Sequence, residues 1–491
     1  MHIFSLFADI LMRVLYFFYD LLWSDLFTIP LPGGSELGVS LLVALLIPAG
    51  LWLTLRTRFV QVRLFGEMLH IALRDPARGQ DGRISGFQAL VISTATRIGM
   101  GNLVGVVAAI SLGGAGAVFW MWVSALIGMA TAFVEATLAQ LYQQEDPLYG
   151  GLRGGPAYYI HAWAARKRNR DPRTLRRSVL AVLFAVSGLI CWCGISQVVG
   201  NSVSSAVFNA FRIPPMFTAI VLTGISAVIV LRKNATVKVL DAVVPVMAGC
   251  FFAATIIVIA MNLERVPEVF HMIFAEAFGL RPMAAGGLGA VIMNGVKRGL
   301  FSNEAGSGSA PCAAAAACVD HPAKEGLLQA FGVFIDTMII CTCSALLMLL
   351  APADVISGLE GMDLLQAAAR WHFGEAGVIF IAVSLLLFSF STFIGILFYA
   401  RPNVAYLFGD RWGRQTAYKL LALAMLFIGC IAAYTFVWDL GDVGVGLMTV
   451  FNLIALLPLS KEAVASLKDY ESRIARRKAK DPSTVPVGME L

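Results

Sequence analysis

Two short stretches place polar residues inside runs that are otherwise apolar. They are "TRIGMGN", residues 96–102, and "KRGLFSNEAGSGS", residues 297–309. An arginine at the middle of a membrane span costs about 2.5–3.5 kcal/mol on insertion scales, so Arg97 is expected to face other protein groups. If the backbone opens at the glycines, its N–H and C=O groups need partners that lipid does not supply. One half-helix then offers N–H groups to a carboxylate, and the other offers carbonyls to an ammonium group or Na+.

The first stretch also has a plainer interpretation in helix packing. Gly101 and Gly105 form a G-x-x-x-G contact face, which is common between membrane helices. The second stretch favours opening, because "GMGN" and "GSGS" both place G-x-G and a polar residue before a run of small side chains. The second interrupted span comes five spans after the first, and an odd number inverts the second copy relative to the first. The pattern therefore predicts an inverted-repeat transporter with its site at the midplane.

The composition places most of this chain in a membrane. Hydrophobic residues make up 58% of the 491 residues and charged residues only 14%, which does not suit a soluble protein. Apolar runs of about 20 residues, the length that spans a bilayer as a helix, recur along the chain. They predict an all-α polytopic membrane protein with eleven transmembrane helices. The expected spans are 37–55, 85–113, 115–143, 178–208, 215–231, 237–262, 286–318, 326–350, 373–400, 416–434 and 441–459.

These spans divide the chain into a leading region, two halves and a tail. The leading region holds an interfacial helix, one span and a cytoplasmic linker, and the two halves are five-helix repeats. The expected core is a 5+5 inverted repeat whose first and sixth helices are broken. The boundaries are 1–84 for the leading region, 85–262 and 263–459 for the repeats, and 460–491 for the basic tail.

The distribution of Lys and Arg predicts the orientation. Most of the 37 basic residues fall on one side of the predicted spans. This asymmetry places the C-terminus in the cytoplasm and the N-terminus outside, in a bacterial inner membrane. The net charge of +6 then faces anionic lipid, so neither nucleic acid nor an obligate protein partner is needed to explain it. The basic residues on the opposite side are Arg13, Arg212, Arg265, Arg281 and Arg370.

Several function classes lack the residues they need. The eight cysteines lie in apolar segments and the six histidines lie in or beside predicted loops, so neither a metal centre nor a base for a serine hydrolase is expected. We therefore do not expect an enzyme. An ion channel is one alternative, although two broken helices in one chain favour a carrier that encloses its substrate. Proton coupling through Glu304 or Asp336 is the other.

The longer motifs resemble those of the alanine or glycine:cation symporter family of sodium-coupled amino acid carriers. The likeness covers about residues 85–460. It implies a fold similar to that of the sodium-coupled leucine transporter, with ten core helices in inverted repeats. The motifs are "RIGMGNLVGVVAAI" (97–110), "GGAGAVFWMWVSALIGMATAFVEATLA" (113–139), "GGPAYYI" (154–160), "VVPVMA" (243–248), "GVKRGLFSNEAGSGSAP" (295–311) and "GVFIDTMIICT" (332–342).

Carried onto matching positions, the resemblance implies a binding site for a small neutral amino acid. The backbone of residues 99–101 and the Asn102 side chain are expected to hold the substrate carboxylate, and Gln197 is expected to contact the substrate. The plainer interpretation of Gln197 is a hydrogen bond between helices. The full expected set is Thr96, Gly99, Met100, Gly101, Asn102, Gln197, Asn201, Ser302, Gly306 and Ile396.

The same resemblance implies Na+ as the coupling ion. Hard cations take oxygen ligands, so we expect backbone carbonyls from one helix and side-chain hydroxyls from another. A hydroxyl bonded back to its own helix is the alternative for both side chains. The expected ligands are the carbonyls of Ala95 and Ile98 and the hydroxyls of Ser391 and Thr392.

Four charged residues within the spans are expected to form a network. Glu304 is expected to balance Arg97 or Arg298 and to shape the field at the site. Arg298 has Glu135 as a second possible partner. Ion pairs with a purely structural role are the alternative. The network consists of Arg97, Glu135, Arg298 and Glu304.

Two positions depart from the family pattern. Typical members carry Thr between the two glycines, where this chain has Met100, and many carry Trp where this chain has Ile396 after Gly395. Loss of an indole ring would enlarge the pocket, and pocket size separates apolar side chains by only about 1–3 kcal/mol per methylene. The sequence therefore predicts Na+-coupled symport of a small neutral amino acid, alanine-like or glycine-like, without fixing which one.

Overall fold

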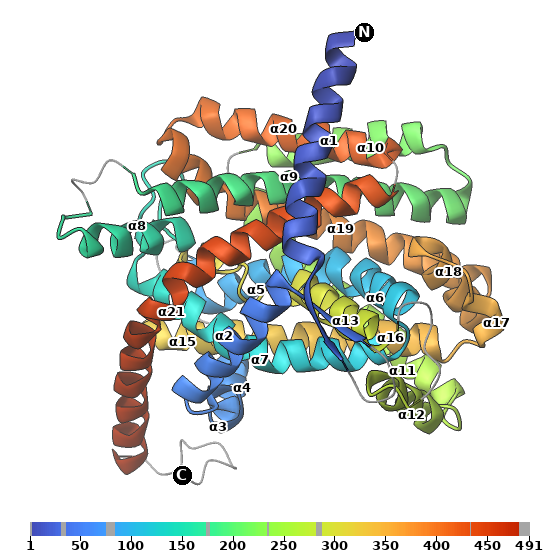
Figure 1. The fold of residues 1–491 in the computed structure, drawn as a ribbon, viewed down its shortest axis with the longest axis horizontal. Coiled ribbons are helices and arrows are strands. Elements are labelled where there is room, and N and C mark those ends of the chain that lie inside the picture. Colours follow the sequence, from blue (N-terminus) through green and yellow to red (C-terminus); the bar gives the residue numbers. More distant parts are fainter. Residues whose placement is uncertain are drawn as a thin grey trace.

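The computed structural model describes residues 2–30, 36–74, 84–172, 177–232, 235–280, 287–432 and 434–480. Side chains at 2–11, 36–37, 95, 98, 235–245, 434–436 and 477–480 fall outside the described part. The described residues are mostly helical. Helices far apart in the sequence lie side by side, with α20 beside α9 and α15 beside α7 (Figure 1). These four elements are α7 (Gly116–Leu141), α9 (Val179–Phe211), α15 (Pro322–Val333) and α20 (Trp412–Ile431).

The N-terminal region begins with a helix that runs across the others. α1 (His2–Trp23) crosses the direction of the long helices in Figure 1. An antiparallel hairpin follows, which the sequence did not predict. α2 begins after Ser40, whose Oγ accepts a hydrogen bond from the Val43 backbone N–H at 3.4 Å. The remaining elements are β1 (Asp25–Pro30), β2 (Glu36–Ser40), α2 (Leu41–Arg56), α3 (Val60–Arg63), α4 (Phe65–Arg74) and β3 (Ile84–Ser85).

The next span is a continuous helix in three parts. α5 (Gly86–Thr96) and α6 (Val106–Gly113) are α-helical, and the π-helix η2 (Arg97–Gly105) joins them. Ser85 and Gln88 form a capping box at the start, with hydrogen bonds of 3.1 and 3.0 Å. The N-terminal end of this span is therefore fixed by side chains.

The middle of the chain contains three apolar helices and a sharp bend. α9 corresponds to the predicted span 178–208, and α10 and α11 correspond to 215–231 and 237–262. α12 turns by 104° away from the end of α11. The elements between α7 and the bend are β4 (Gln144–Glu145), β5 (Leu152–Arg153), α8 (Pro156–Lys167), α10 (Pro215–Val230), α11 (Ala235–Met261) and α12 (Val266–Ala277).

The C-terminal half contains a broken helix and a second π-helix. α13 (Gly287–Asn303) stops in mid-span, and a short α14 (Pro311–Ala314) follows after turns. α15, the π-helix η3 (Phe334–Cys341) and α16 (Thr342–Leu349) form one continuous span. The other elements are β6 (Ala317–Cys318), α17 (Ala353–Ile356), α18 (Gly361–Phe373), α19 (Glu375–Phe408) and α21 (Tyr434–Lys480).

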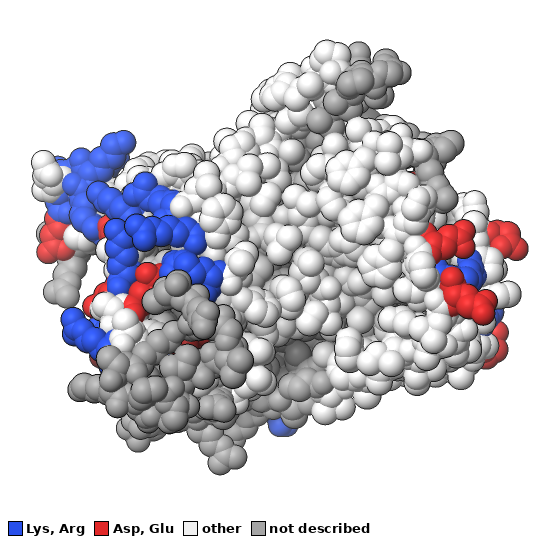
Figure 2. Space-filling model, turned by 90° about the horizontal axis from the view of Figure 1, so that it is seen from below, with Lys and Arg blue, Asp and Glu red and all other residues white. Residues whose placement is uncertain are grey.

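The helix lengths support a multi-pass membrane protein. In the described ranges, seven helices are long and apolar enough to cross a membrane, or eight if α11 and α12 count as one bent span. α2 and α10 are apolar but shorter, at 16 residues each, and the break leaves α13 with 17. Figure 2 shows basic side chains gathered at one end, acidic ones prominent at the other, and a broad uncharged belt between them. Such a belt is what lipid requires.

Candidate functional site

The first polar stretch is widened rather than broken. Residues Arg97–Gly105 form the π-helix η2, in which the chain keeps internal hydrogen bonds with a longer repeat. The prediction of an open backbone at Gly99–Gly101 was therefore wrong. The glycines serve close approach instead: a Cβ on Gly101 would lie 3.0 Å from the Ser302 Cα, and one on Gly99 would collide with the Thr392 hydroxyl.

The second polar stretch is interrupted, as predicted. Glu304, Gly306 and Gly308 have φ values of 56°, 93° and 83°, in the left-handed region. Glycine adopts this region freely, whereas a glutamate there stores strain. The freed backbone of Gly306 finds partners on other helices: its N–H donates to Glu135 Oε2 at 3.1 Å, and its carbonyl accepts from Asn452 Nδ2 at 3.0 Å. Asn452 also donates to Glu135.

The two stretches meet at a buried polar junction with η3. Asn102 Nδ2 donates to the Asp336 carbonyl at 3.0 Å, and Ser302 Oγ donates to Asp336 Oδ2 at 2.9 Å. The Thr337 hydroxyl donates to the same carboxylate oxygen at 2.7 Å. These four side chains are at most 1% exposed, and Asp336 Oδ1 has no hydrogen-bond partner among the described residues. We call this set, Asn102, Ser302, Asp336 and Thr337, the polar junction.

A hydroxyl of α19 touches the other side of η2. Thr392 Oγ1 accepts from the Met100 backbone N–H at 3.4 Å and lies 3.5 Å from the Thr96 carbonyl. It also donates to the Phe388 carbonyl of its own helix at 3.0 Å. The Ser391 hydroxyl donates to the same carbonyl at 2.8 Å. The structure therefore brings Thr392 to η2, while both hydroxyls also make the own-helix bond that the sequence left open.

Two of the expected Na+ ligands are defined only in their backbone. Ala95 belongs to α5 and Ile98 to η2, but their side chains lie outside the described residues. The Thr96 carbonyl between them faces the Thr392 hydroxyl. The carbonyl that contacts Thr392 therefore belongs to the residue next to one expected ligand and two before the other, and the expected ligand set stays a prediction.

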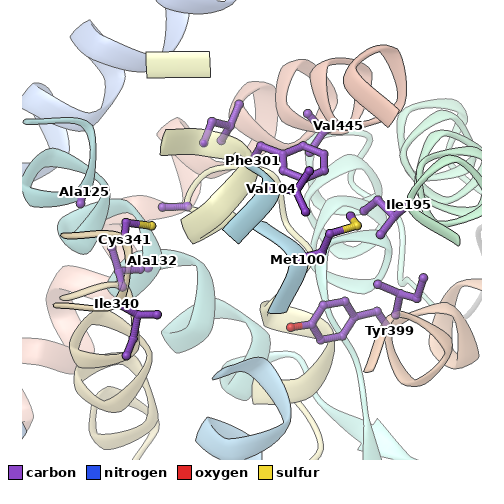
Figure 3. Packing of buried hydrophobic residues seen from close by; sticks show 14 of the residues in the cluster. Met100, Val104, Ala125, Ala132, Ile195, Phe301, Ile340, Cys341, Tyr399 and Val445 are labelled. Carbon is purple, nitrogen blue, oxygen red and sulfur yellow. The ribbon is translucent and has the colours of Figure 1, made fainter. Parts of the chain in front are cut away.

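The other expected substrate residues separate into two groups. Gln197 donates to Met425 Sδ at 3.0 Å and Asn201 donates to the Ala432 carbonyl at 2.9 Å. Both side chains therefore bond toward α20 and its C-terminal end, not to the polar junction. Met100, by contrast, is 1% exposed and its sulfur points toward Ile195 (Figure 3). Ile396 is also buried, at 1% exposure.

Arg298 pairs differently from the prediction. Arg298 lies against Asp442 of α21, with N–O distances of 3.3 and 3.4 Å, and does not pair with Glu135 or Glu304. Arg97 donates to the Gln329 carbonyl at 3.4 Å, and its Nε and Nη2 have no hydrogen-bond partner among the described residues. The carboxyl groups in electrostatic range of Arg97 belong to Glu135, Glu304, Glu325 and Asp336.

Tyr399 links Glu304 to the first stretch. Its hydroxyl lies 2.5 Å from the Thr96 hydroxyl and also hydrogen-bonds the Glu304 carboxyl. Tyr399 is fully buried, and Figure 3 places its ring below Met100. The strained Glu304 is therefore coupled to η2 through one phenol group.

Sequence reasoning missed three residues that hold this site together. Asn452 and Asp442 are single polar groups within the last apolar span, and Tyr399 lies in "LFYARPN" at the end of another. Polar residues in an apolar run are a usable signal, because buried polar groups in membranes need partners. Asp442 lies 144 positions from Arg298, Asn452 lies 317 from Glu135 and Tyr399 lies 303 from Thr96, so spacing alone could not identify these partners.

Together, the apolar spans, the broken helix and the buried polar junction define a multi-pass membrane transporter. The family model described as "Sodium:alanine symporter family" matches residues 34–485, and the chain belongs to this family. The resemblance carried by the motifs is thereby confirmed. The chain is a symporter-family protein and not an enzyme.

Relatives with similar sequences cover most of the chain. The probable sodium/glutamine symporter GlnT of Bacillus subtilis is 40% identical over 94% of this chain and 91% of its own length. The sodium/alanine symporter AgcS of Methanococcus maripaludis is 36% identical over 90% and 96%. A sodium/proton-dependent alanine carrier protein of Bacillus sp. (strain PS3) is 37% identical over 84% and 93%. A solved manganese transporter of Eremococcus coleocola aligns at 14% identity and a TM-score of 0.49 over 79% of this chain and 80% of that chain.

Proposed function

We propose that this protein carries a small neutral amino acid into the cell together with Na+. The observation that supports it best is the polar junction, where Asn102 of η2, Ser302 at the broken helix and Asp336 of η3 converge away from water. Polar groups buried at such a depth are expensive and usually functional. Each positive charge that crosses 100 mV releases about 2.3 kcal/mol, so Na+ entry is a sufficient driving force.

The proposed substrate position is the space around η2 and the broken helix. The Asn102 amide and the Ser302 hydroxyl supply polar contacts, and the backbone near Gly306 supplies the ends of the broken helix. Met100 and Ile396 form the apolar wall for the substrate side chain. The remaining proposed contacts are Thr96, Gly99, Gly101, Gln197 and Asn201.

The proposed Na+ position lies between η2 and α19. Thr392 already places a hydroxyl oxygen 3.5 Å from the Thr96 carbonyl, and Na+ takes oxygen ligands. The carbonyls of Ala95 and Ile98 and the Ser391 hydroxyl complete the proposed set. Relatives named sodium/alanine and sodium/glutamine symporters support the choice of ion and leave the side chain of the amino acid to experiment.

We also propose eleven crossings, with the N-terminus outside and the C-terminus in the cytoplasm of a bacterial inner membrane. The count requires α2, α10, the bent α11 and the broken pair α13–α14 to cross in addition to the seven long helices of the described ranges. α2 and α10 are apolar, and the basic end in Figure 2 supports a cytoplasmic side. Two five-helix halves would then surround the polar junction.

Proton coupling is the second candidate. Four buried carboxyl groups share the neighbourhood of one arginine, and Asp336 Oδ1 and Glu304 Oε2 lack hydrogen-bond partners among the described residues. A relative is named a sodium/proton-dependent carrier. A buried carboxyl of this kind can carry a proton.

Uptake into proteoliposomes tests both candidates. Radiolabelled alanine and glutamine are offered under an inward Na+ gradient, an inward proton gradient, or neither. We expect accumulation with Na+ and its loss when Na+ is equal on both sides. Accumulation driven by the proton gradient alone would overturn Na+ coupling. Uptake that neither saturates nor shows counterflow would indicate a channel.

A further inference from the structure

A second group of buried charges lies outside the polar junction. Lys297 Nζ of α13 lies 2.7 Å from Asp442 Oδ2 of α21, and Arg298 contacts the same carboxylate from the other side. All three residues are at most 6% exposed. Asp439 lies in electrostatic range of both cations, so two acids balance two bases. This charge group joins the first half of the broken helix to α21.

Helix α1 closes over this charge group. The Tyr19 hydroxyl accepts a hydrogen bond from Lys297 Nζ at 2.7 Å. The same ammonium lies 4.5 Å from the centre of the Tyr19 ring and 4.7 Å from that of Trp23, distances at which cation–π attraction operates. The Trp23 indole N–H donates to the Asp442 carbonyl at 3.1 Å. α1 therefore holds both partners, Lys297 on one helix and Asp442 on the other.

The charge group is continuous with the candidate site. Arg298 lies 4.5 Å from the centre of the Trp438 ring, and Trp438 contacts Phe301 at 4.9 Å between ring centres. Ser302, the next residue, donates to Asp336 in the polar junction. Lys297 and Ser302 belong to the same helix α13, which ends at Asn303. A shift of α13 away from α21 must therefore move Ser302 as well.

We propose that α1 is a latch, in which Tyr19 and Trp23 position Lys297 against Asp442 and hold this end of the transport site closed. Release of these contacts accompanies the movement of α13 that opens the site. α1 lies outside the two proposed repeats and contacts the charge group without contacting the polar junction, so it acts through Lys297 and not on the substrate. The inference rests on the proposed transport function, because only a carrier needs α13 to move.

A buried cysteine reports the opening. Cys341 is 1% exposed and its Sγ lies 3.1 Å from Ser302 Oγ, so N-ethylmaleimide reaches it only when α13 moves. Cys318 is exposed and lies in the short strand β6, outside the membrane-spanning helices, so it gives the rate for an accessible thiol. Cys430 is buried in α20, away from the latch, and reports general loosening. Labelling of each cysteine is followed by mass spectrometry on the full chain in lipid vesicles.

The decisive variant is Tyr19→Phe, which removes the hydroxyl and keeps the ring. A hydrogen bond to a charged group is lost, so we expect the labelling rate of Cys341 to rise about tenfold with Cys430 unchanged. Trp23→Phe, which removes the indole N–H, should give a rise in the same direction. The matched control is Tyr16→Phe on the same helix, because Tyr16 is 44% exposed.

Two outcomes would overturn the latch. One is an unchanged Cys341 rate in both Tyr19→Phe and Trp23→Phe. The other is an equal rise at Cys341 and Cys430, which would indicate only a less stable fold. Wild-type alanine and glutamine uptake is measured separately, so absence of Na+-driven transport would count against the proposed function and not against the labelling result.

Discussion

The two Gly-x-Gly stretches have similar sequences and different structures. Around Gly99 and Gly101 the chain stays helical as η2, whereas between Asn303 and Pro311 the helix is interrupted. Glu304, Gly306 and Gly308 have positive φ, while no residue of η2 does. The glycines of η2 allow other helices to approach, and those of the second stretch allow the backbone to turn.

External partners account for this difference. Glu135 and Asn452 supply an acceptor and a donor to the Gly306 backbone, so the open chain there keeps its hydrogen bonds inside the membrane. Open backbone is tolerated at this depth only with such partners. At η2 the neighbours Thr392 and Ser302 come so close that the helix widens and retains its own bonds. In this protein, hydrogen-bond partners from other helices distinguish the interrupted stretch from the helical one, although both contain Gly-x-Gly.

Removing the external acceptor should have the largest effect. Glu135→Leu leaves the Gly306 N–H and one of the two N–H groups of the Asn452 amide without an acceptor, while the other still donates to the Gly306 carbonyl. Two buried unsatisfied donors cost about 4 kcal/mol together. We expect a marked fall in the melting temperature of the purified protein and loss of uptake. Glu135→Gln keeps an oxygen for Gly306 and should lose much less. Equal melting temperatures for Glu135→Leu and wild type would break the comparison.

Substitution of a glycine by alanine should affect stability differently in the two stretches. A Cβ on Gly308 would lie 2.7 Å from Pro156 Cγ at a φ of 83°, so Gly308→Ala should destabilise by about 2–3 kcal/mol. Gly105 has φ −64° and only a Phe301 carbon at 3.9 Å. Gly105→Ala should therefore be neutral or stabilise by up to about 1 kcal/mol. Thermal melting checks both, and similar effects would mean that the two stretches are equivalent.

Asp336 contacts both Gly-x-Gly stretches, through Asn102 and Ser302. Removing its charge should lower the efficiency of Na+-driven uptake. Asp336→Asn keeps the shape but weakens the hydrogen bonds from Ser302 and Thr337, with an expected effect of about 1.5–2 kcal/mol on transport. The measurement is kcat/KM for alanine uptake at several Na+ concentrations. A kcat/KM of Asp336→Asn equal to that of the wild type would show that Asp336 is not part of the site. Uptake by Asp336→Asn under a proton gradient alone would contradict a role for Asp336 as the proton carrier.

The smallest expected effect is at the contact between η2 and α19. Thr392→Val removes the hydroxyl that faces the Thr96 carbonyl and the Met100 N–H, a change of about 1 kcal/mol. We expect the Na+ concentration for half-maximal uptake to rise about fivefold. Ser389→Ala on the same helix is the control, because the Ser389 hydroxyl has no hydrogen-bond partner among the described residues. An equal rise of the half-maximal Na+ concentration in Thr392→Val and Ser389→Ala would show that Thr392 does not bind the ion.

The sequence predicted much of this architecture because hydrophobic runs and breaks are local signals. The expected spans at 85–113 and 115–143 match α5–η2–α6 and α7 closely. The interruption at residues 304–310 also followed from local sequence, as glycines and serines replace apolar residues there. Family membership likewise followed from continuous motifs.

The missed features depend on contacts between distant segments. A π-helix differs from an α-helix by one residue in its hydrogen-bond spacing, and no residue type in "RIGMGNLVG" marks that choice. Arg298 was expected near Glu304 or Glu135, but the rotation of α13 turns it toward Asp442 in the last span. Side-chain partners across a bundle are set by packing, which the sequence of one helix does not contain.

The parallel pairing of β3 with β6 has a mechanical consequence. Ile84 and Ser85 pair with Ala317 and Cys318. The residues just before α5 are therefore hydrogen-bonded to the residues just after α14. α5 and α14, from opposite halves of the chain, are thus joined at that end by one short parallel strand pair. In the proposed transport cycle these two helices would move together, and bending would fall to the π-helical turns of η2 and the interrupted backbone at Gly306.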